Sequence, residues 1–147
     1  MNVYTIGFTE KSAKTFFTLL RKNGVRRVLD VRLNNISQLA GFAKKNDLIY
    51  FLKELSNADY IHVPELTPTK LILDAYKKKE ITWSIYEEKF TNLMAQRSIE
   101  NTIDKNLLDD GCLLCSEHLP HHCHRKIVVD YLNKHWNMAL KVTHLVS

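Results

Sequence analysis

The residues best suited to chemistry lie close together, between positions 115 and 125. This segment contains Cys115, Glu117, Cys123, His124 and Arg125, together with three further histidines. A thiol can act as a nucleophile or redox group, a glutamate or histidine can transfer protons, and an arginine can bind an anion. The segment follows a short apolar run and precedes a helical pattern, so we expect a functional loop between a strand and a helix.

The residues Cys123, His124 and Arg125 are predicted to lie in the first turn of that helix. Backbone N–H groups at a helix start have no helical partner, and the helix dipole favours negative charge there. Cys123 could therefore be a thiolate nucleophile, or the helix start could hold a phosphate with Arg125 as counter-charge. The structural alternative is a buried, inert Cys123 and an Arg125 that pairs with Asp30 or Glu117.

Metal binding is a further possibility for the same segment. Its cysteines and histidines are all chemically able to bind zinc: Cys115, His118, His121, His122, Cys123 and His124. The spacing lacks the second pair of ligands that a zinc finger would have. We therefore predict no metal ligands and leave the cofactor unknown, with zinc as the alternative.

The third cysteine, Cys112, lies three residues before Cys115 on the predicted strand. Successive side chains of a strand point to opposite faces, so Cys112 should face away from Cys115. We interpret Cys112 as a small buried core residue rather than half of a redox motif.

A second pair of polar residues, Asp30 and Arg32, follows another predicted strand. Their two-residue spacing places both side chains on the same side of an extended segment. The pair is either a structural ion pair that fixes the loop or a functional one. In the functional case, the planar guanidinium of Arg32 could bind a phosphate or carboxylate.

The elements that position these residues follow an alternating order. Strand patterns at residues 2–7, 25–31, 60–63, 112–115 and 140–145 are separated by helical patterns, the clearest at about 46–57, 83–94 and 121–136. A helix after the first strand is capped by Thr9 or Ser12 and ends at Asn23-Gly24. This alternation predicts an α/β fold, with residues 1–147 forming a single Rossmann-like domain whose mainly parallel sheet is flanked by helices.

In such a sheet the site lies beyond the carboxyl ends of the strands. Asp30 and Arg32, Cys115 and Glu117, and the loop after Gly7 should therefore face one rim. The aromatic stripe at 83–94 is interpreted as core.

Composition narrows the class of protein. The 147 residues are 45% hydrophobic and 25% charged, which is ordinary for a globular domain, and the net charge of +5 favours anionic partners. No apolar run could span a bilayer, and the amino-terminal residues do not resemble a signal peptide. Three clustered cysteines do not resemble a secreted disulfide framework. We expect a cytoplasmic protein without membrane contact.

Several motifs together resemble one family. They are Thr5-Ile-Gly7, Asp30-Val-Arg32, the segment 60–65, Cys115-Ser-Glu117 with Cys123-His-Arg125, and the closing segment 142–145. In this order they resemble the DUF488 family of small prokaryotic α/β proteins, over nearly the whole chain. The resemblance implies a DUF488-like domain and a candidate site whose members are Asp30, Arg32, Cys115, Glu117, Cys123, His124 and Arg125. It implies no settled reaction.

Two departures from the family pattern concern the loops near the site. Phe8-Thr9 stands where the family usually has His-Ser, and 66–69 replaces a Leu-Gly-Gly turn. The first departure predicts altered or lost activity if the family histidine takes part in the chemistry, and the second predicts different substrate-facing loops.

Three functions compete at this stage. The first is an enzyme, a hydrolase or transferase, acting on a nucleotide or nucleic acid, with Arg32 and Arg125 binding the anion. In that enzyme Asp30 or Glu117 would be the acid or base, and Cys115 or Cys123 the nucleophile. The second is a nucleic-acid-binding module that uses lysines such as Lys44, Lys45 and the run 77–79. The third is a thiol redox or metal-sensing protein that uses Cys115 and Cys123.

Overall fold

A five-stranded sheet forms the centre of the protein. The computed structural model describes residues 1–34, 38–116, 122–137 and 140–146. The strand order is β3-β2-β4-β1-β5, and every neighbouring pair is parallel. The strands are β1 (Asn2–Gly7), β2 (Arg27–Asp30), β3 (Asp59–His62), β4 (Gly111–Cys115) and β5 (Lys141–Leu145). The predicted α/β class is confirmed, with a sheet that is parallel throughout.

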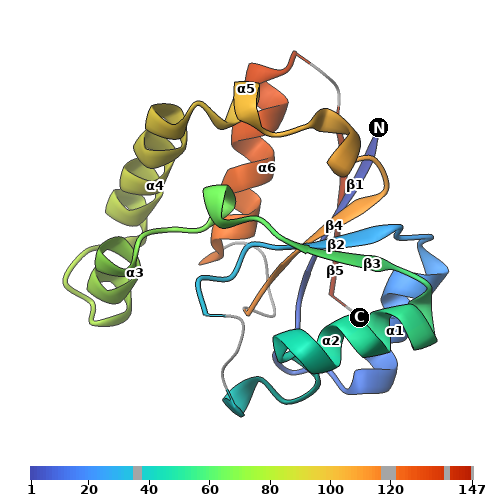
Figure 1. The fold of residues 1–147 in the computed structure, drawn as a ribbon. Helices are drawn as coiled ribbons and strands as arrows, with labels where there is room; N and C mark the ends of the chain where they lie inside the picture. The colour runs from blue at the N-terminus through green and yellow to red at the C-terminus, as the bar shows by residue number, and fades with distance from the viewer. Residues whose placement is uncertain (35–37, 117–121, 138–139, 147) are drawn as a thin grey trace.

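One face of the sheet is covered by the helices that follow β1 and β2 (Figure 1). Helix α1 (Ala13–Lys22) begins at Ser12, whose side chain accepts a hydrogen bond from the backbone N–H of Thr15, and Phe16, Phe17 and Leu20 are its buried residues. Helix α2 (Lys45–Phe51) continues into a π-helical turn, η2 (Leu52–Ser56), and follows the short 3-10 segment η1 (Gln38–Ala43). Their apolar side chains share one core cluster with the residues of the sheet that face them.

The opposite face carries the remaining helices (Figure 1). They are α3 (Lys70–Lys77), α4 (Trp83–Arg97), α5 (Ile99–Thr102) and α6 (His124–His135), with 3-10 turns η3 (Pro64–Leu66) and η4 (Lys105–Leu107). Thr69 and Thr82 cap α3 and α4 through their hydroxyl groups. As predicted from their helical spacing, Tyr86, Phe90 and Met94 are buried in the core.

The start of β4 requires a glycine because the chain is crowded there. A Cβ atom on Gly111 would lie 2.7 Å from the carbonyl oxygen of Leu107 and 2.8 Å from a methyl carbon of Leu29. Gly111 thus lets β4 enter the centre of the sheet directly below η4.

Several predicted boundaries differ from the observed ones. Strand β2 covers 27–30 rather than 25–31, and the helical region after position 68 is divided into separate helices. Helix α6 begins at His124 rather than near 121 because Cys123 has extended φ and ψ angles of −136° and 139° and serves as the N-cap. Among the described residues, no helix has both the length and the apolar character needed to cross a membrane.

Candidate functional site

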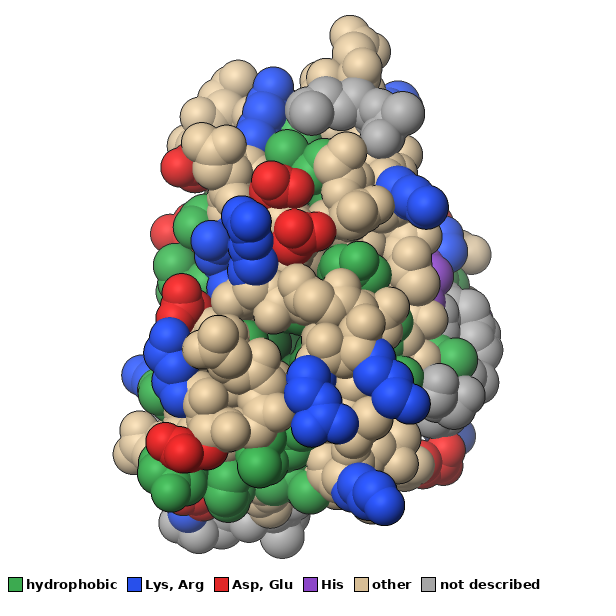
Figure 2. Space-filling view, turned by 90° about the vertical axis from the view of Figure 1, so that its right-hand side faces the viewer, with side chains coloured by type: hydrophobic (Ala, Val, Ile, Leu, Met, Phe, Trp, Pro, Cys, Tyr) green, Lys and Arg blue, Asp and Glu red, His purple; other side chains and the backbone are tan. Residues whose placement is uncertain are grey.

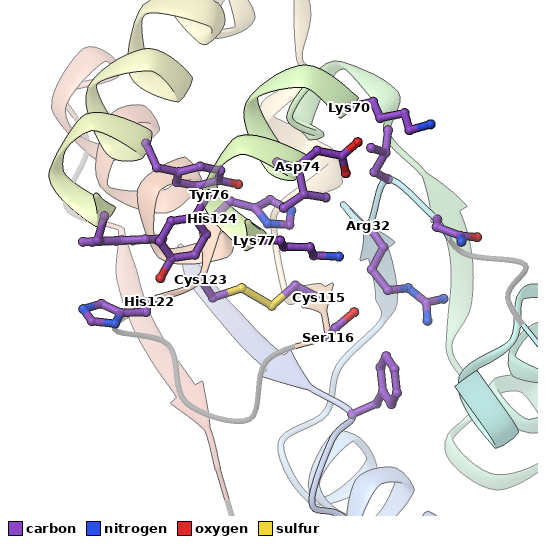
Figure 3. Close-up of a pocket in the computed structure, with 16 residues that line it drawn as sticks. Arg32, Lys70, Asp74, Tyr76, Lys77, Cys115, Ser116, His122, Cys123 and His124 are labelled. Carbon is purple, nitrogen blue, oxygen red and sulfur yellow. A yellow bond between two sulfur atoms is a disulfide. The ribbon is translucent and has the colours of Figure 1, made fainter. Parts of the chain in front are cut away.

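A cavity of about 530 Å³ lies at the carboxyl edge of the sheet (Figure 3). Residues that directly follow three strands line it: Phe8 after β1, Arg32 after β2, and Ser116 after β4. Side chains of α3 and α4 and the start of α6 complete its wall. The cavity therefore occupies the place where open parallel sheets bind ligands.

Cys115 and Cys123 are joined by a disulfide in the wall of this cavity. Cys115 is the last residue of β4, Cys123 is the N-cap of α6, and their relative exposures are only 1% and 3%. Cys112 packs in the other core cluster, on the opposite face of the sheet. Burial raises the pKa of the Cys112 thiol, which keeps it protonated. The prediction that Cys112 is a core residue facing away from Cys115 is confirmed.

Arg125 is fully buried and contacts one sulfur of the disulfide. Its Nη1 group donates a hydrogen bond to Cys115 Sγ at 3.6 Å. The sequence suggested either Asp30 or Glu117 as an acidic partner of Arg125. Asp30 pairs instead with Arg32, and Glu117 lies outside the described residues.

Asp30 and Arg32 form a buried ion pair with two parallel hydrogen bonds. The Nε and Nη2 groups of Arg32 donate to Asp30 Oδ1 and Oδ2, each at 2.8 Å. The Arg32 backbone N–H also donates to Oδ1 at 3.1 Å, and the Tyr60 hydroxyl donates to Oδ2 at 2.6 Å. Both oxygens of Asp30 are thus occupied, so this geometry supports a positioning role for Asp30 rather than proton transfer.

The third nitrogen of the guanidinium, Arg32 Nη1, is buried without a hydrogen-bond partner among the residues that the structure describes. Arg32 lines the cavity, and its guanidinium carbon lies 5.5 Å from the centre of the Phe8 ring. A buried donor without a partner is costly, so a ligand oxygen that reached this atom would form a favourable hydrogen bond. Phe8 is one of the departures from the family pattern, and it contacts this guanidinium directly.

His124 connects α6 to the end of β2. Its Nε2 lies 2.5 Å from the carbonyl oxygen of Val31, which can only accept, so Nε2 carries the proton. Burial lowers the pKa of His124 to about 4, an effect that the Val31 hydrogen bond opposes and the charge of Arg125 reinforces. His124 is therefore neutral near pH 7 and fixes the start of α6 beside the cavity.

Sequence reasoning missed the residues that α3 and α4 contribute to the site. Lys70 and Lys77 line the cavity together with Asp74, Tyr76 and Trp83. The sequence connected Lys77 only with the surface lysine run 77–79 of a nucleic-acid-binding module, and interpreted Trp83 as the first residue of a core stripe. Neither lies next to a strand end in the sequence, so no local pattern connected them with the site.

The rings form a continuous aromatic wall. The centroid of Trp83 lies 5.2 Å from that of Tyr86 in a stacked arrangement, 5.5 Å from that of Tyr76, and 5.0 Å from that of His122. Burial raises the pKa of Tyr86, so its hydroxyl stays protonated. The wall gives the cavity an aromatic surface that it shares with Lys70 and Lys77.

The metal hypothesis concerns the segment 115–124. Within the described ranges, no three histidine, cysteine, aspartate or glutamate side chains are grouped so that they could hold a metal ion. Glu117, His118 and His121 lie outside the described residues.

The fold and site define a class: parallel α/β proteins with a ligand-sized cavity at the carboxyl edge of the sheet. Within that class, the chain belongs to the family described as "Domain of unknown function DUF488", which matches residues 12–132. The resemblance inferred from the motifs is thereby confirmed. No significant match was found among curated proteins or among solved structures.

Proposed function

We propose that the cavity binds, and acts on, a small phosphate-bearing molecule of the size of a mononucleotide. The observation that carries this proposal is the geometry of Arg32. Asp30 holds two of its guanidinium nitrogens, and the third is buried without a partner among the described residues. An arginine held in this way can donate to a phosphate oxygen once a small side-chain movement opens Nη1 to the cavity.

The charges around the cavity support an anionic ligand. Arg32, Lys70 and Lys77 line it, against one carboxylate, Asp74. Figure 3 shows Lys77 extending into the space between the disulfide and Arg32. Because Asp30 already neutralises Arg32, the two lysines supply most of the attraction for an anion.

The aromatic wall and the size of the cavity favour a ligand with a planar group. Trp83 and Tyr76 offer ring surface on which a nucleobase can stack. The volume of 530 Å³ falls within the range of about 300–1,000 Å³ that is typical of small-molecule sites. A mononucleotide would place its base on the rings and its phosphate near the cations.

The proposed catalytic roles rest on the residue types in the segment that begins at Cys115. Glu117, two residues after Cys115, is the proposed general acid or base, and Cys115 in its reduced state is the proposed nucleophile. Glu117→Gln should abolish turnover of a nucleotide substrate while leaving its affinity unchanged. Unchanged turnover would remove Glu117 from the mechanism.

Binding is tested by calorimetric titration with adenosine monophosphate, adenosine and inorganic phosphate. We expect the nucleotide to bind at least about tenfold more tightly than the nucleoside, which corresponds to about 1.4 kcal/mol. Lys77→Gln should weaken nucleotide binding about five- to tenfold, as expected for loss of a charged contact. Lys78→Gln is the matched control, because Lys78 is exposed on the same helix end and does not line the cavity.

Either of two results would refute the binding proposal. One is equal affinity for nucleoside and nucleotide. The other is an equal effect of Lys77→Gln and Lys78→Gln. Quenching of Trp83 fluorescence, with Trp83→Phe as the control for signal from Trp136, gives an independent measure of whether the base reaches the aromatic wall.

Binding of nucleic acid to the surface has less support. On the face shown in Figure 2, several lysine and arginine side chains lie beside carboxylates rather than in a continuous basic patch. Lys44 lies 4.0 Å from Asp47, within an ion pair. A single-stranded oligonucleotide that binds more tightly than the mononucleotide, with affinity falling steeply as salt rises, would favour the binding module instead.

A further inference from the structure

The two bonded cysteines come from different elements and meet in the wall of the cavity. Cys115 ends β4, Cys123 caps α6, and eight positions separate them in the sequence. The third cysteine, Cys112, is fully buried on the other face of the sheet. Any change in thiol oxidation state within the folded chain is therefore confined to Cys115 and Cys123.

In the part of the chain that the structure describes, the cavity leads to these sulfur atoms. Both cysteines are nearly inaccessible at the outer surface, with exposures of 1% and 3%, yet both line the cavity. Figure 3 shows the disulfide bordering the cavity beside Ser116. A molecule that reacts with this pair through the cavity must be small enough to enter that space.

Arg125 makes the two sulfur atoms different from each other. Its Nη1 lies 3.6 Å from Cys115 Sγ, and the whole side chain is buried. When the bond is reduced, this positive charge stabilises a thiolate on Cys115. The start of α6 also favours a thiolate on Cys123, but the full charge of Arg125 in contact with Cys115 outweighs the partial charge of the helix dipole. Since the thiolate is the form that attacks a disulfide, we assign Cys115 as the attacking residue and Cys123 as the resolving one.

We propose that Cys115 and Cys123 are a thiol–disulfide exchange pair for a low-molecular-weight disulfide that carries carboxylate groups. The Cys115 thiolate attacks one sulfur of the small disulfide, forms a mixed disulfide with it, and releases one small thiolate. The Cys123 thiol loses its proton to that thiolate or to solvent, attacks Cys115 Sγ, and releases the second small thiol. Two protein thiols are oxidised, one small disulfide is reduced to two thiols, and the reverse reaction with small thiols restores the pair.

The charges of the cavity select the substrate class. Lys70 and Lys77 line the same cavity as the disulfide, and their positive charges attract carboxylates. The exchange does not rest on phosphate binding, because the reacting atoms are only the two protein sulfurs and those of the small disulfide.

The test uses the full chain, reduced and freed of reductant, with glutathione disulfide as the probe. Thiol titration and intact mass should show loss of two of the three thiols within one chain, without an adduct and with Cys112 still reduced. Cys123→Ser should accumulate a stable glutathione adduct on Cys115. Cys115→Ser should react at least about tenfold more slowly, and Cys112→Ser, the matched control, should behave like the unmodified protein.

Selectivity is tested with cystamine, a smaller disulfide that is cationic. We expect glutathione disulfide to react faster despite its size. Equal or faster reaction with cystamine would overturn the assigned substrate class. Adducts on Cys112, disulfides only between chains, or equal rates for Cys115→Ser and Cys123→Ser would overturn the exchange pair itself.

Two further measurements keep the test decisive. If a cysteine variant fails to fold, the reduced protein is given a short pulse of iodoacetamide and the labelled sites are found by peptide mapping. Cys115 should be labelled before Cys123, and the opposite order would contradict the assignment. The variant Lys77→Gln, which should weaken nucleotide binding, should still form the intramolecular disulfide, more slowly with glutathione disulfide because one attracting charge is lost, but without accumulating an adduct because the reacting sulfur atoms are unchanged. Failure of nucleotide binding and failure of exchange are therefore separate outcomes.

Discussion

Replacing Asp30 with asparagine tests how the site is built. Asp30 is fully buried and Arg32 is 3% exposed, and two hydrogen bonds of 2.8 Å join their side chains. Asp30→Asn keeps the shape of the side chain and one acceptor oxygen but removes the negative charge. The Arg32 guanidinium would then be a buried cation without a counter-ion.

The expected cost follows from the burial of both groups. Breaking a buried ion pair by removing one partner typically destabilises a protein by about 3–5 kcal/mol, because the remaining charge is left uncompensated. In the double variant Asp30→Leu with Arg32→Met, no charge remains buried. Its cost should be only about 1–3 kcal/mol, because the Tyr60 hydroxyl and the backbone N–H of residue 32 lose their acceptor.

Urea unfolding followed by circular dichroism measures both costs, with equal m-values as the check that the unfolding transition is the same. Arg32→Met alone completes a double-mutant cycle. The reasoning fails if Asp30→Asn costs less than about 1 kcal/mol, or if the double variant costs as much as the two single variants added together. The double variant also separates the roles of the pair, since it should fold and yet lose nucleotide affinity.

Three further outcomes are expected. Reduction of the Cys115–Cys123 bond should lower the free energy of unfolding by about 2.5 kcal/mol, because the bond closes a loop across eight positions and so lowers the entropy of the unfolded chain. Urea titrations with and without reductant measure this difference, and an unchanged midpoint would contradict it. The pKa of His124 is about 4 in the folded protein and 6.5 ordinarily. Between pH 6.5 and pH 4, His124 is therefore protonated in the unfolded chain but neutral in the folded one. Stability should therefore fall as pH is lowered from 6.5 to 4, by up to about 3 kcal/mol, and His124→Gln should flatten that dependence. Gly111→Ala should destabilise by about 1–3 kcal/mol in thermal unfolding, because its Cβ would lie 2.7 Å from the Leu107 carbonyl oxygen; a neutral effect would show that η4 can move aside.

The sequence determined those features that depend on neighbours along the chain. The alternation of strand and helix patterns predicted a parallel α/β fold, because parallel strands need a crossover between them. Two-residue spacing placed Asp30 and Arg32 on one side of an extended segment, and three-residue spacing placed Cys112 opposite Cys115. Each of these inferences uses only local backbone geometry, and each is confirmed.

For the segment 115–125, the sequence did not decide between a nucleophile, a zinc site and a redox pair. The choice between these depends on distances that no spacing fixes. The structure joins Cys115 to Cys123 and places the Arg125 guanidinium against Cys115.

The tertiary structure alone decided which side chains face one another across the cavity. The strand order β3-β2-β4-β1-β5 brings β2 and β4 together, so the residues after positions 30 and 115 meet although they are far apart in sequence. Lys77 and Trp83 reach the same cavity because α3 and α4 pack over this edge of the sheet, and that packing follows from burial of their apolar faces. The local sequence pattern fixes the direction in which a side chain points from its own helix or strand. Which side chain it meets depends on how separate helices and strands bury their apolar surfaces against one another.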